Sequence, residues 1–237
     1  VARNESKFLK LMEQDTFRAN AHNIVFIPGD LTDTASTVLA AERAVEWAGG
    51  HVHVLVNNAG IVVEDTLIDA SVDDWNRQFA VNVRSPFLFA RAVSGGMIDN
   101  KCGKIINISS QASMLSLHKH GIYSSTKAAL DGMTRAMASE LSCHNVQVNS
   151  VAPTVVMTDM GRKVWGQGDD KAQRMLDCLP LGRFAEIEEI TSMVSYLASD
   201  ASNIIAGQTL CCDGGVSTVG LHIRKRDVDA AETEVAA

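Results

Sequence analysis

Short apolar runs alternate with longer segments of helical period along this chain, and that order restricts the fold more than any other feature. The runs are rich in β-branched residues and apolar on both faces, as is typical of strands buried in a parallel sheet. They cover Val25–Ile27, Val52–Val56, Ile105–Ile108, Val146–Val151 and a last run near 208–212. Helical periodicity lies between them, at about 34–48, 71–94, 122–142 and 186–199. This order predicts an α/β fold with a doubly wound, Rossmann-like parallel sheet, which binds ligands at the carboxyl ends of its strands.

The chain has the size and composition of one domain. Its 237 residues are 46% hydrophobic and 21% charged, which suffices for a substantial core. We expect the domain to span residues 1–215. The segment 216–237 carries a basic cluster (Arg224, Lys225, Arg226) followed by acids and alanines, and we expect it to be a flexible tail. The first residue is Val1 rather than Met, so the recorded start need not be the biological one.

Charge and cysteine usage exclude several classes of function. The formal charge is −7 and acids and bases are interspersed, so we expect no nucleic-acid binding. Five cysteines show no Cys-x-x-Cys spacing and no pairing with histidines, so we expect no metal site and reduced thiols in an intracellular, cytoplasmic protein. The sequence has no apolar run of eighteen residues and no signal-peptide pattern, so we expect no membrane association.

Tyr123 and Lys127 are the strongest candidates for chemistry. If 122–142 is a helix, their spacing of four places the phenol and the ammonium on one face. A free tyrosine, with a pKa near ~10, is a poor proton donor or acceptor at neutral pH, and a nearby cation favours its ionised form. The pair therefore predicts an acid/base tyrosine, although the spacing alone also arises by chance.

Three further groups end predicted strands, where the topology places a ligand. Asn57–Gly60 ends one strand, and the missing side chain of Gly60 lets a flat ligand approach the backbone, although an ordinary turn gives the same pattern. Asp30 could accept a hydrogen bond from a base amino group or cap a helix. Ser110 either contacts a ligand or forms a turn, and a nucleophilic role is less convincing because no histidine and acid partners are evident.

Asn82 lies in the middle of the helix expected at 71–94, where asparagine has a poor helical propensity. Pro86 follows four residues later and has no N–H, so the carbonyl of Asn82 lacks its usual helical donor. A free carbonyl near the strand ends can hold a water molecule. The alternative is a simple proline kink with a solvated asparagine.

Taken in order and at their separations, these motifs resemble the short-chain dehydrogenase/reductase family over about residues 1–215. They are Asn57–Gly60, Asn82, Ser110 and Tyr123-x-x-x-Lys127, and Cys212–Gly215 also resembles the last strand of the family. Within the family, segments 107–113 and 153–161 look most like the L-xylulose (dicarbonyl) reductases. Thr154 replaces the glycine of most members, a difference that this group shares.

The resemblance implies an enzyme that interconverts a carbonyl and an alcohol on a small sugar, polyol or α-dicarbonyl. Tyr123 would be the general acid or base, Lys127 would lower its pKa and hold the nicotinamide ribose, and Ser110 would bind the substrate oxygen. Asn82 would hold a water that links Lys127 to solvent in a proton relay. Candidates for further substrate contacts are Gln111, His120 and Trp165, although Gln111 could be merely exposed and Trp165 could merely cover the core or an interface.

The same resemblance implies a nicotinamide cofactor. Ala2 and Arg3 stand where an acidic residue would bind the ribose diol of NAD, and a guanidinium suits a 2′-phosphate, so NADP is favoured. The implied cofactor contacts are Arg3, Asp30, Leu31, Asn57, Ala59, Gly60, Tyr123, Lys127, Pro153, Val156 and Thr158. Relatives of this kind are commonly homotetramers, and the small residues Ala128, Ala129 and Ala136 would permit close helix packing between subunits or within one.

The glycine-rich turn of the family, Thr-Gly-x-x-x-Gly-x-Gly, is absent from the sequence. The first glycine is Gly29, at the end of a predicted strand, and Gly49 follows a helix instead of opening one. Aligned on Arg3, the chain lacks on the order of thirty to forty residues, about one βαβ unit. We expect a truncated record rather than an inactive product. The alternatives are the same chemistry on a 3-oxoacyl thioester or hydroxysteroid, and a catalytically silent binding subunit.

Overall fold

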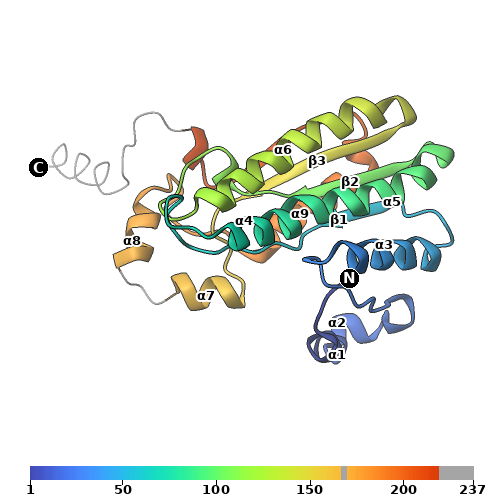
Figure 1. Cartoon of the computed structure of the whole chain (residues 1–237), viewed down its shortest axis with the longest axis horizontal. Helices are drawn as coiled ribbons and strands as arrows, with labels where there is room; N and C mark the ends of the chain where they lie inside the picture. The colour runs from blue at the N-terminus through green and yellow to red at the C-terminus, as the bar shows by residue number, and fades with distance from the viewer. Residues whose placement is uncertain (167–169, 219–237) are drawn as a thin grey trace, which may run out of the picture.

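A parallel four-stranded sheet forms the centre of the protein (Figure 1). The structure is a computed structural model that describes residues 1–166 and 170–218. The sheet has the order β1-β2-β3-β4 and every neighbouring pair is parallel, which confirms the predicted α/β class. The strands are β1 (Val54–Asn57), β2 (Gly103–Ile108), β3 (Val146–Pro153) and β4 (Thr209–Cys212). The predicted tail lies outside the described residues from 219 onward.

Helices cover both faces of the sheet. Ile105 packs with α5 (Ser85–Asn100) and α6 (Gly121–Leu141), whereas its neighbour Ile106 packs with α9 (Ile187–Ala198) on the opposite face. The remaining α-helices of the described chain are α1 (Glu5–Met12), α2 (Asp15–Arg18), α3 (Thr34–Trp47), α4 (Val72–Phe79), α7 (Asp159–Trp165) and α8 (Asp170–Asp177). No helix in this part of the chain is long and apolar enough to cross a membrane.

The helix expected at 71–94 is divided by a π-helical turn. After α4 the backbone forms the turn η2 (Ala80–Arg84), in which the N–H of Ser85 donates to the carbonyl of Ala80, five residues back. Pro86 lacks the N–H that an α-helix would direct at the carbonyl of Asn82. The segment expected to be helical is helical, but its hydrogen bonding changes from α to π at the position that the sequence had marked as irregular. Helical π-turns of this kind occur frequently at functional sites.

The strand expected at Val25–Ile27 was also wrong. Only Ala2 and Pro28 form an isolated parallel bridge, supported by hydrogen bonds from Ala2 N–H to the Ile27 carbonyl and from Gly29 N–H to the Ala2 carbonyl. A strand needs a continuous neighbour, and in the described residues the backbone pairing of this segment is limited to the bridge with Ala2. This apolar run contributes to the core through Ile27, which is buried in a cluster with residues of α3 and α5.

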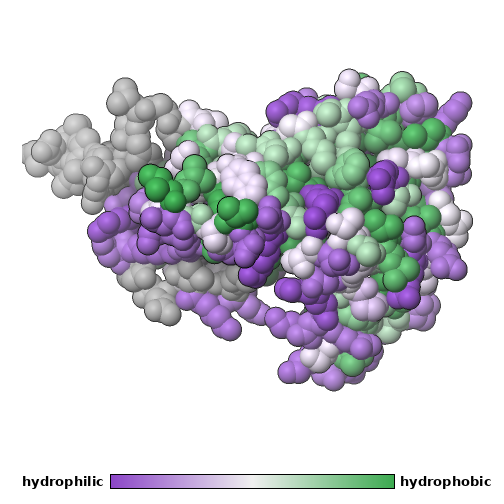
Figure 2. Space-filling view, in the orientation of Figure 1, coloured by the Kyte–Doolittle hydropathy of each residue, from purple (hydrophilic) through white to green (hydrophobic). Residues whose placement is uncertain are grey.

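β1 is an edge strand rather than the fully buried strand that its sequence predicts. The carbonyl of His53 accepts from Lys104 of β2, so Val54 and Val56 direct their backbone groups away from the sheet. Their exposed fractions are 37% and 41%. A groove of about 560 Å³ follows this edge, with Val1, Trp47 and Phe89 in its walls. Figure 2 shows hydrophobic surface on this side of the molecule, between α5 and α3.

Candidate active site

Gly60, Asn82 and Lys127 converge at the carboxyl end of β1. A Cβ added to Gly60 would lie 3.5 Å from both the Asn82 Oδ1 and the Lys127 Nζ. Gly60 follows β1, Asn82 lies in η2 and Lys127 lies on α6, so three elements distant in sequence supply one site. The structure thus brings together residues that are far apart in the sequence, where topology placed a ligand.

Asn82 holds this arrangement through three hydrogen bonds. Its Oδ1 accepts from the Ile61 N–H at 2.9 Å, and its Nδ2 donates to the Ile61 carbonyl at 2.9 Å and to the Thr126 Oγ1 at 3.0 Å. The side chain is buried. It therefore joins the loop after β1 to helix α6, and it is not the solvated asparagine of the simple-kink alternative.

Lys127 is buried, with 4% of its surface exposed, and its Nζ donates to the Ile108 carbonyl at 2.7 Å. Burial lowers the pKa of the ammonium to about 8, and the negative charge of Asp131 opposes this change. The Nζ lies 5.6 Å from the centroid of the Tyr123 ring. Lysine and tyrosine therefore face one region, as the spacing of four predicts.

Tyr123 and Ser110 also meet in this region. Burial raises the pKa of the Tyr123 phenol, and a side-chain hydrogen bond with Ser110 opposes that rise. Ser110 stands just after β2 as the N-cap of η3 (Gln111–Ser113), and its Oγ accepts from the Ala112 N–H at 3.1 Å. The hydrogen bond with Ser110 is thus the contact that lowers the pKa of the phenol.

A cavity of about 220 Å³ gathers most of the residues expected to bind the adenosine half of a cofactor. Arg3, Asp30, Leu31, Ala59 and Gly60 all line it. Arg77 of α4 lines the same cavity, and the sequence had not singled it out. Asn57 lies elsewhere: it faces the groove beside β1, and its Nδ2 donates to the Asn107 Oδ1 at 2.8 Å.

Asp30 does not cap a helix. Thr32 donates to the Asp30 Oδ1 from its N–H at 2.9 Å and from its hydroxyl at 2.8 Å, and these hydrogen bonds lower the pKa of the carboxyl. The N-cap of α3 is Asp33, which accepts from the Ser36 N–H. The capping alternative for Asp30 was thus wrong, and a charged carboxylate faces the cavity beside two arginines.

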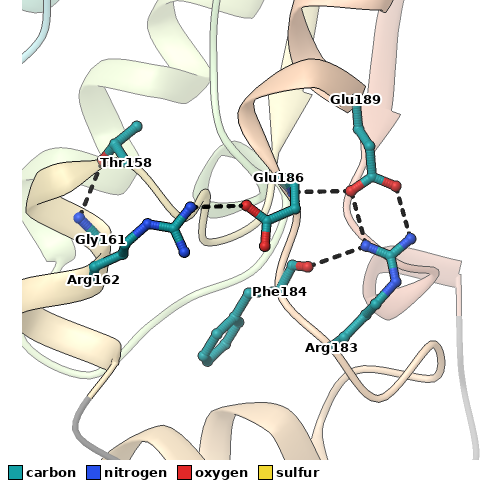
Figure 3. Close-up of polar contacts among 7 residues, drawn as sticks. All are labelled: Thr158, Gly161, Arg162, Arg183, Phe184, Glu186 and Glu189. Carbon is teal, nitrogen blue, oxygen red and sulfur yellow. Dashed lines mark hydrogen bonds and ion pairs between the residues drawn. The ribbon is translucent and has the colours of Figure 1, made fainter.

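Pro153 and Val156 precede Thr158, which begins a segment that polar contacts fix in place (Figure 3). Pro153 ends β3, Val156 forms a bridge with Ala185, and Thr158 caps α7 by accepting from the Gly161 N–H at 3.1 Å. Gly161 is required here because a Cβ would lie 2.1 Å from the Val156 carbonyl oxygen.

Two ion pairs complete the same segment. Arg162 donates to Glu186 at 3.1 Å, and Arg183 binds both carboxylate oxygens of Glu189 at 2.7 and 2.8 Å (Figure 3). The Arg183 side chain and the Glu186 N–H lower the pKa of Glu189 to about 2. These contacts connect Arg162 of α7 and Arg183 to the start of α9.

The candidate substrate residues fall on two sides of the site. His120 and Trp165 line one cavity of about 370 Å³ together with Lys171 and Arg174, and His120 also packs edge-on against Tyr123 at 6.2 Å. Trp165 also packs against Phe184, so it both lines the cavity and contacts the buried core. Gln111 is only 2% exposed, which overturns the exposed-side-chain alternative, and its Oε1 has no partner among the described residues.

Sequence reasoning missed three residues of the site. Thr126 bonds Asn82, Arg77 lines the cavity with Arg3, and Asp131 influences Lys127. Asp131 had a usable signal, because it follows Lys127 by four on a predicted helix. The described residues contain no cluster of three or more His, Cys, Asp or Glu side chains that could hold a metal ion.

The sequence is similar to those of known enzymes. Residues 3–217 match a family profile described as enoyl-(acyl carrier protein) reductase. The chain is 42% identical to an L-xylulose reductase from Caenorhabditis elegans over 91% of this chain and 84% of the relative.

Two solved structures have the same fold. One is a mutant short-chain dehydrogenase/reductase from Serratia marcescens, with a TM-score of 0.81, 30% identity and coverage of 92% of this chain and 86% of that chain. The other is a gluconate 5-dehydrogenase from Burkholderia cenocepacia in complex with NADP and tartrate, with a TM-score of 0.81, 30% identity and coverage of 92% and 85%.

Proposed function

The chain is an oxidoreductase of the short-chain dehydrogenase/reductase family, and we propose that it interconverts a carbonyl and an alcohol on a small sugar, polyol or α-dicarbonyl with NADP(H). One observation carries this proposal: a buried lysine and a buried asparagine flank Gly60, and the same lysine lies beside the half-buried Tyr123 ring. The names of the xylulose and gluconate relatives support a polyhydroxylated substrate.

In the proposed mechanism Tyr123 donates a proton to the substrate oxygen during reduction and accepts it during oxidation. Ser110 hydrogen-bonds the same oxygen, and its contact with the phenol supports this placement. Lys127 contributes a positive charge beside the phenol. Asn82 orders the backbone at Ile61, and we propose that its main-chain carbonyl holds the water that relays protons from Lys127.

The residues present fit the two ends of a nicotinamide dinucleotide. Arg3, Asp30, Leu31 and Ala59 would hold the adenosine end, with the Arg3 guanidinium at a 2′-phosphate. Lys127, Tyr123 and the loop residues Pro153, Val156 and Thr158 would hold the nicotinamide end, and Asn57 would support the strand between them. When bound, the cofactor supplies the hydride. The described residues include no glycine-rich helix start for the pyrophosphate.

Binding of adenosine phosphates tests the cofactor preference without relying on turnover. We expect Arg3→Ser to weaken binding of 2′,5′-ADP by at least ~tenfold in calorimetry, because a charge-assisted hydrogen bond is lost. Binding of 5′-AMP should be unchanged. Arg43→Ser, at an exposed position of α3, is the matched control. Equal losses for both nucleotides would contradict a phosphate-specific role of Arg3.

A substrate panel with NADPH and NADH distinguishes the remaining functions. We expect turnover of L-xylulose or diacetyl. Preferred turnover of a 3-oxoacyl thioester or a hydroxysteroid would favour the same chemistry on one of those substrates. The matching profile is described as an acyl carrier protein reductase, so the thioester belongs in the panel. No turnover, with thermal stability unchanged by NADPH, would favour a binding subunit instead.

We also propose that residues 1–215 form the catalytic domain and that the protein is a cytoplasmic homotetramer. All five cysteines are free thiols, which suits a reducing compartment. Ala128 and Ala136 are exposed on α6 and would allow close approach of a second subunit there. Sedimentation velocity measures the mass directly, and a monomer at micromolar concentration would reject the assembly.

A further inference from the structure

Asp131 is a buried carboxylate that the proposed mechanism does not use. Only 5% of its surface is exposed, and its Oδ1 has no hydrogen-bond partner among the described residues. Removing a carboxylate from water is costly unless another charge or several donors compensate. Its position in α6 therefore needs a compensating group nearby.

Lys127 is the compensating group that the helix provides. It precedes Asp131 by four residues, and both side chains lie on the buried face of α6. Residues at this spacing are neighbours on a helix surface. Burial lowers the pKa of Lys127, and the charge of Asp131 acts in the opposite direction. The charge of Asp131 thus partly offsets the burial of the ammonium.

The elements that pack against α6 offer Lys127 no comparable partner. Neither β3 nor η3 carries a titratable side chain. On β2, Lys104 is occupied by Ser202 and Asn203. On η2, Arg84 donates to the Thr32 carbonyl. The other titratable groups on these neighbours are Asp73, Asp74 and Arg77 of α4, and Cys143 and His144 of η4 (Ser142–His144), while α6 itself adds Tyr123, Arg135 and Glu140.

We propose that Asp131 is a positioning residue that keeps the Lys127 ammonium charged and directed at the active site. The inference rests on the proposed role of Lys127 and adds a residue behind it. Gly60 lies beside the Lys127 Nζ, whereas Asp131 follows the lysine one helical turn further along α6. A carboxylate in this place would favour the charged form of the lysine through its negative charge.

The sign of the effect follows from the two opposing influences. With Asp131 present, Lys127 is protonated below a pKa of about 8 and neutral above it. Without the negative charge, the burial effect acts unopposed and the amine loses its proton at a lower pH. At pH 7 to 8 a larger fraction of the variant would then lack the ammonium that the phenol requires.

The experiment compares Asp131→Asn with Glu140→Gln, which removes one negative charge from an exposed position of the same helix. The lysine is titrated in the unliganded protein through its ¹³Cε resonance, assigned by its loss in Lys127→Met. We expect Asp131→Asn to lower the titration midpoint by about one pH unit. The alkaline limb of the reduction rate should move to lower pH by the same amount, and Asp131→Glu should restore both.

Two results would overturn the proposal. One is a Lys127 midpoint that is the same in wild type, Asp131→Asn and Glu140→Gln. The other is a loss of stability in Asp131→Asn and in Asp131→Ser with an unchanged midpoint, which would make Asp131 merely structural. Because the titration needs neither cofactor nor substrate, it remains decisive even if the proposed activity fails.

Discussion

Asn82 shows how much one side chain can organise in this site. Its amide uses one acceptor and two donor bonds to connect the loop after β1 with α6. Its sequence context had suggested an unusual backbone, because Pro86 removes a helical donor. The side-chain bonds to Ile61 and Thr126 could not be predicted, since both partners look like ordinary residues in the sequence.

Replacing Asn82 should therefore reduce stability as well as activity. We expect Asn82→Ala to lower the free energy of unfolding by about 2–3 kcal/mol, because groups of Ile61 and Thr126 lose their partner. Urea denaturation measures the change. Asn76→Ala, at an exposed position of α4, is the control and should change little. Equal, small effects of both variants would show that the hydrogen bonds of Asn82 contribute nothing to the free energy of unfolding.

At the scale of elements, period and composition located the four strands of the sheet and the helices α3, α6 and α9, but not α1, α2, α7 or α8. α6 begins and ends within one residue of the expected range of 122–142, because its apolar stripe and its length are local properties. Val25–Ile27 and β1 have the composition of buried strands, but pairing depends on what lies beside them. The bridge at Ala2 and the position of β1 at the edge of the described sheet depend on tertiary contacts, which the hydrophobic periodicity of the sequence cannot predict.

Among the described residues no strand pairs with the outer edge of β1, and this has a measurable consequence for a protein of this sequence. An unpaired, apolar edge promotes association between sheets, and a charged side chain on the edge opposes it. We expect Val56→Lys to decrease concentration-dependent light scattering. Val72→Lys introduces the same charge at an exposed valine of α4 and should have no such effect. An equal decrease in both variants would attribute the change to net charge alone.

For the whole molecule, the order of motifs was more informative than any single motif. Tyr123 and Lys127 alone left chance as an explanation, whereas Asn57–Gly60, Asn82 and Ser110 fixed the family. In the structure Asn82 and Lys127 lie beside Gly60, Tyr123 lies beside Lys127, and Ser110 contacts Tyr123. Arg77 and Asp131 were missed because a lone charge on a helix is usually solvated, and only tertiary packing reveals where each one lies.

The most direct test of the central claim is the rate of NADPH-dependent L-xylulose reduction by wild type and Tyr123→Phe. The variant keeps the ring and loses only the hydroxyl. We predict turnover by the wild type and a decrease of about 10²–10⁴-fold in the variant, the usual contribution of a general acid. Circular dichroism should show the same fold for both. A variant that reduces the substrate at the wild-type rate, or a wild type that does not reduce it, would contradict the account.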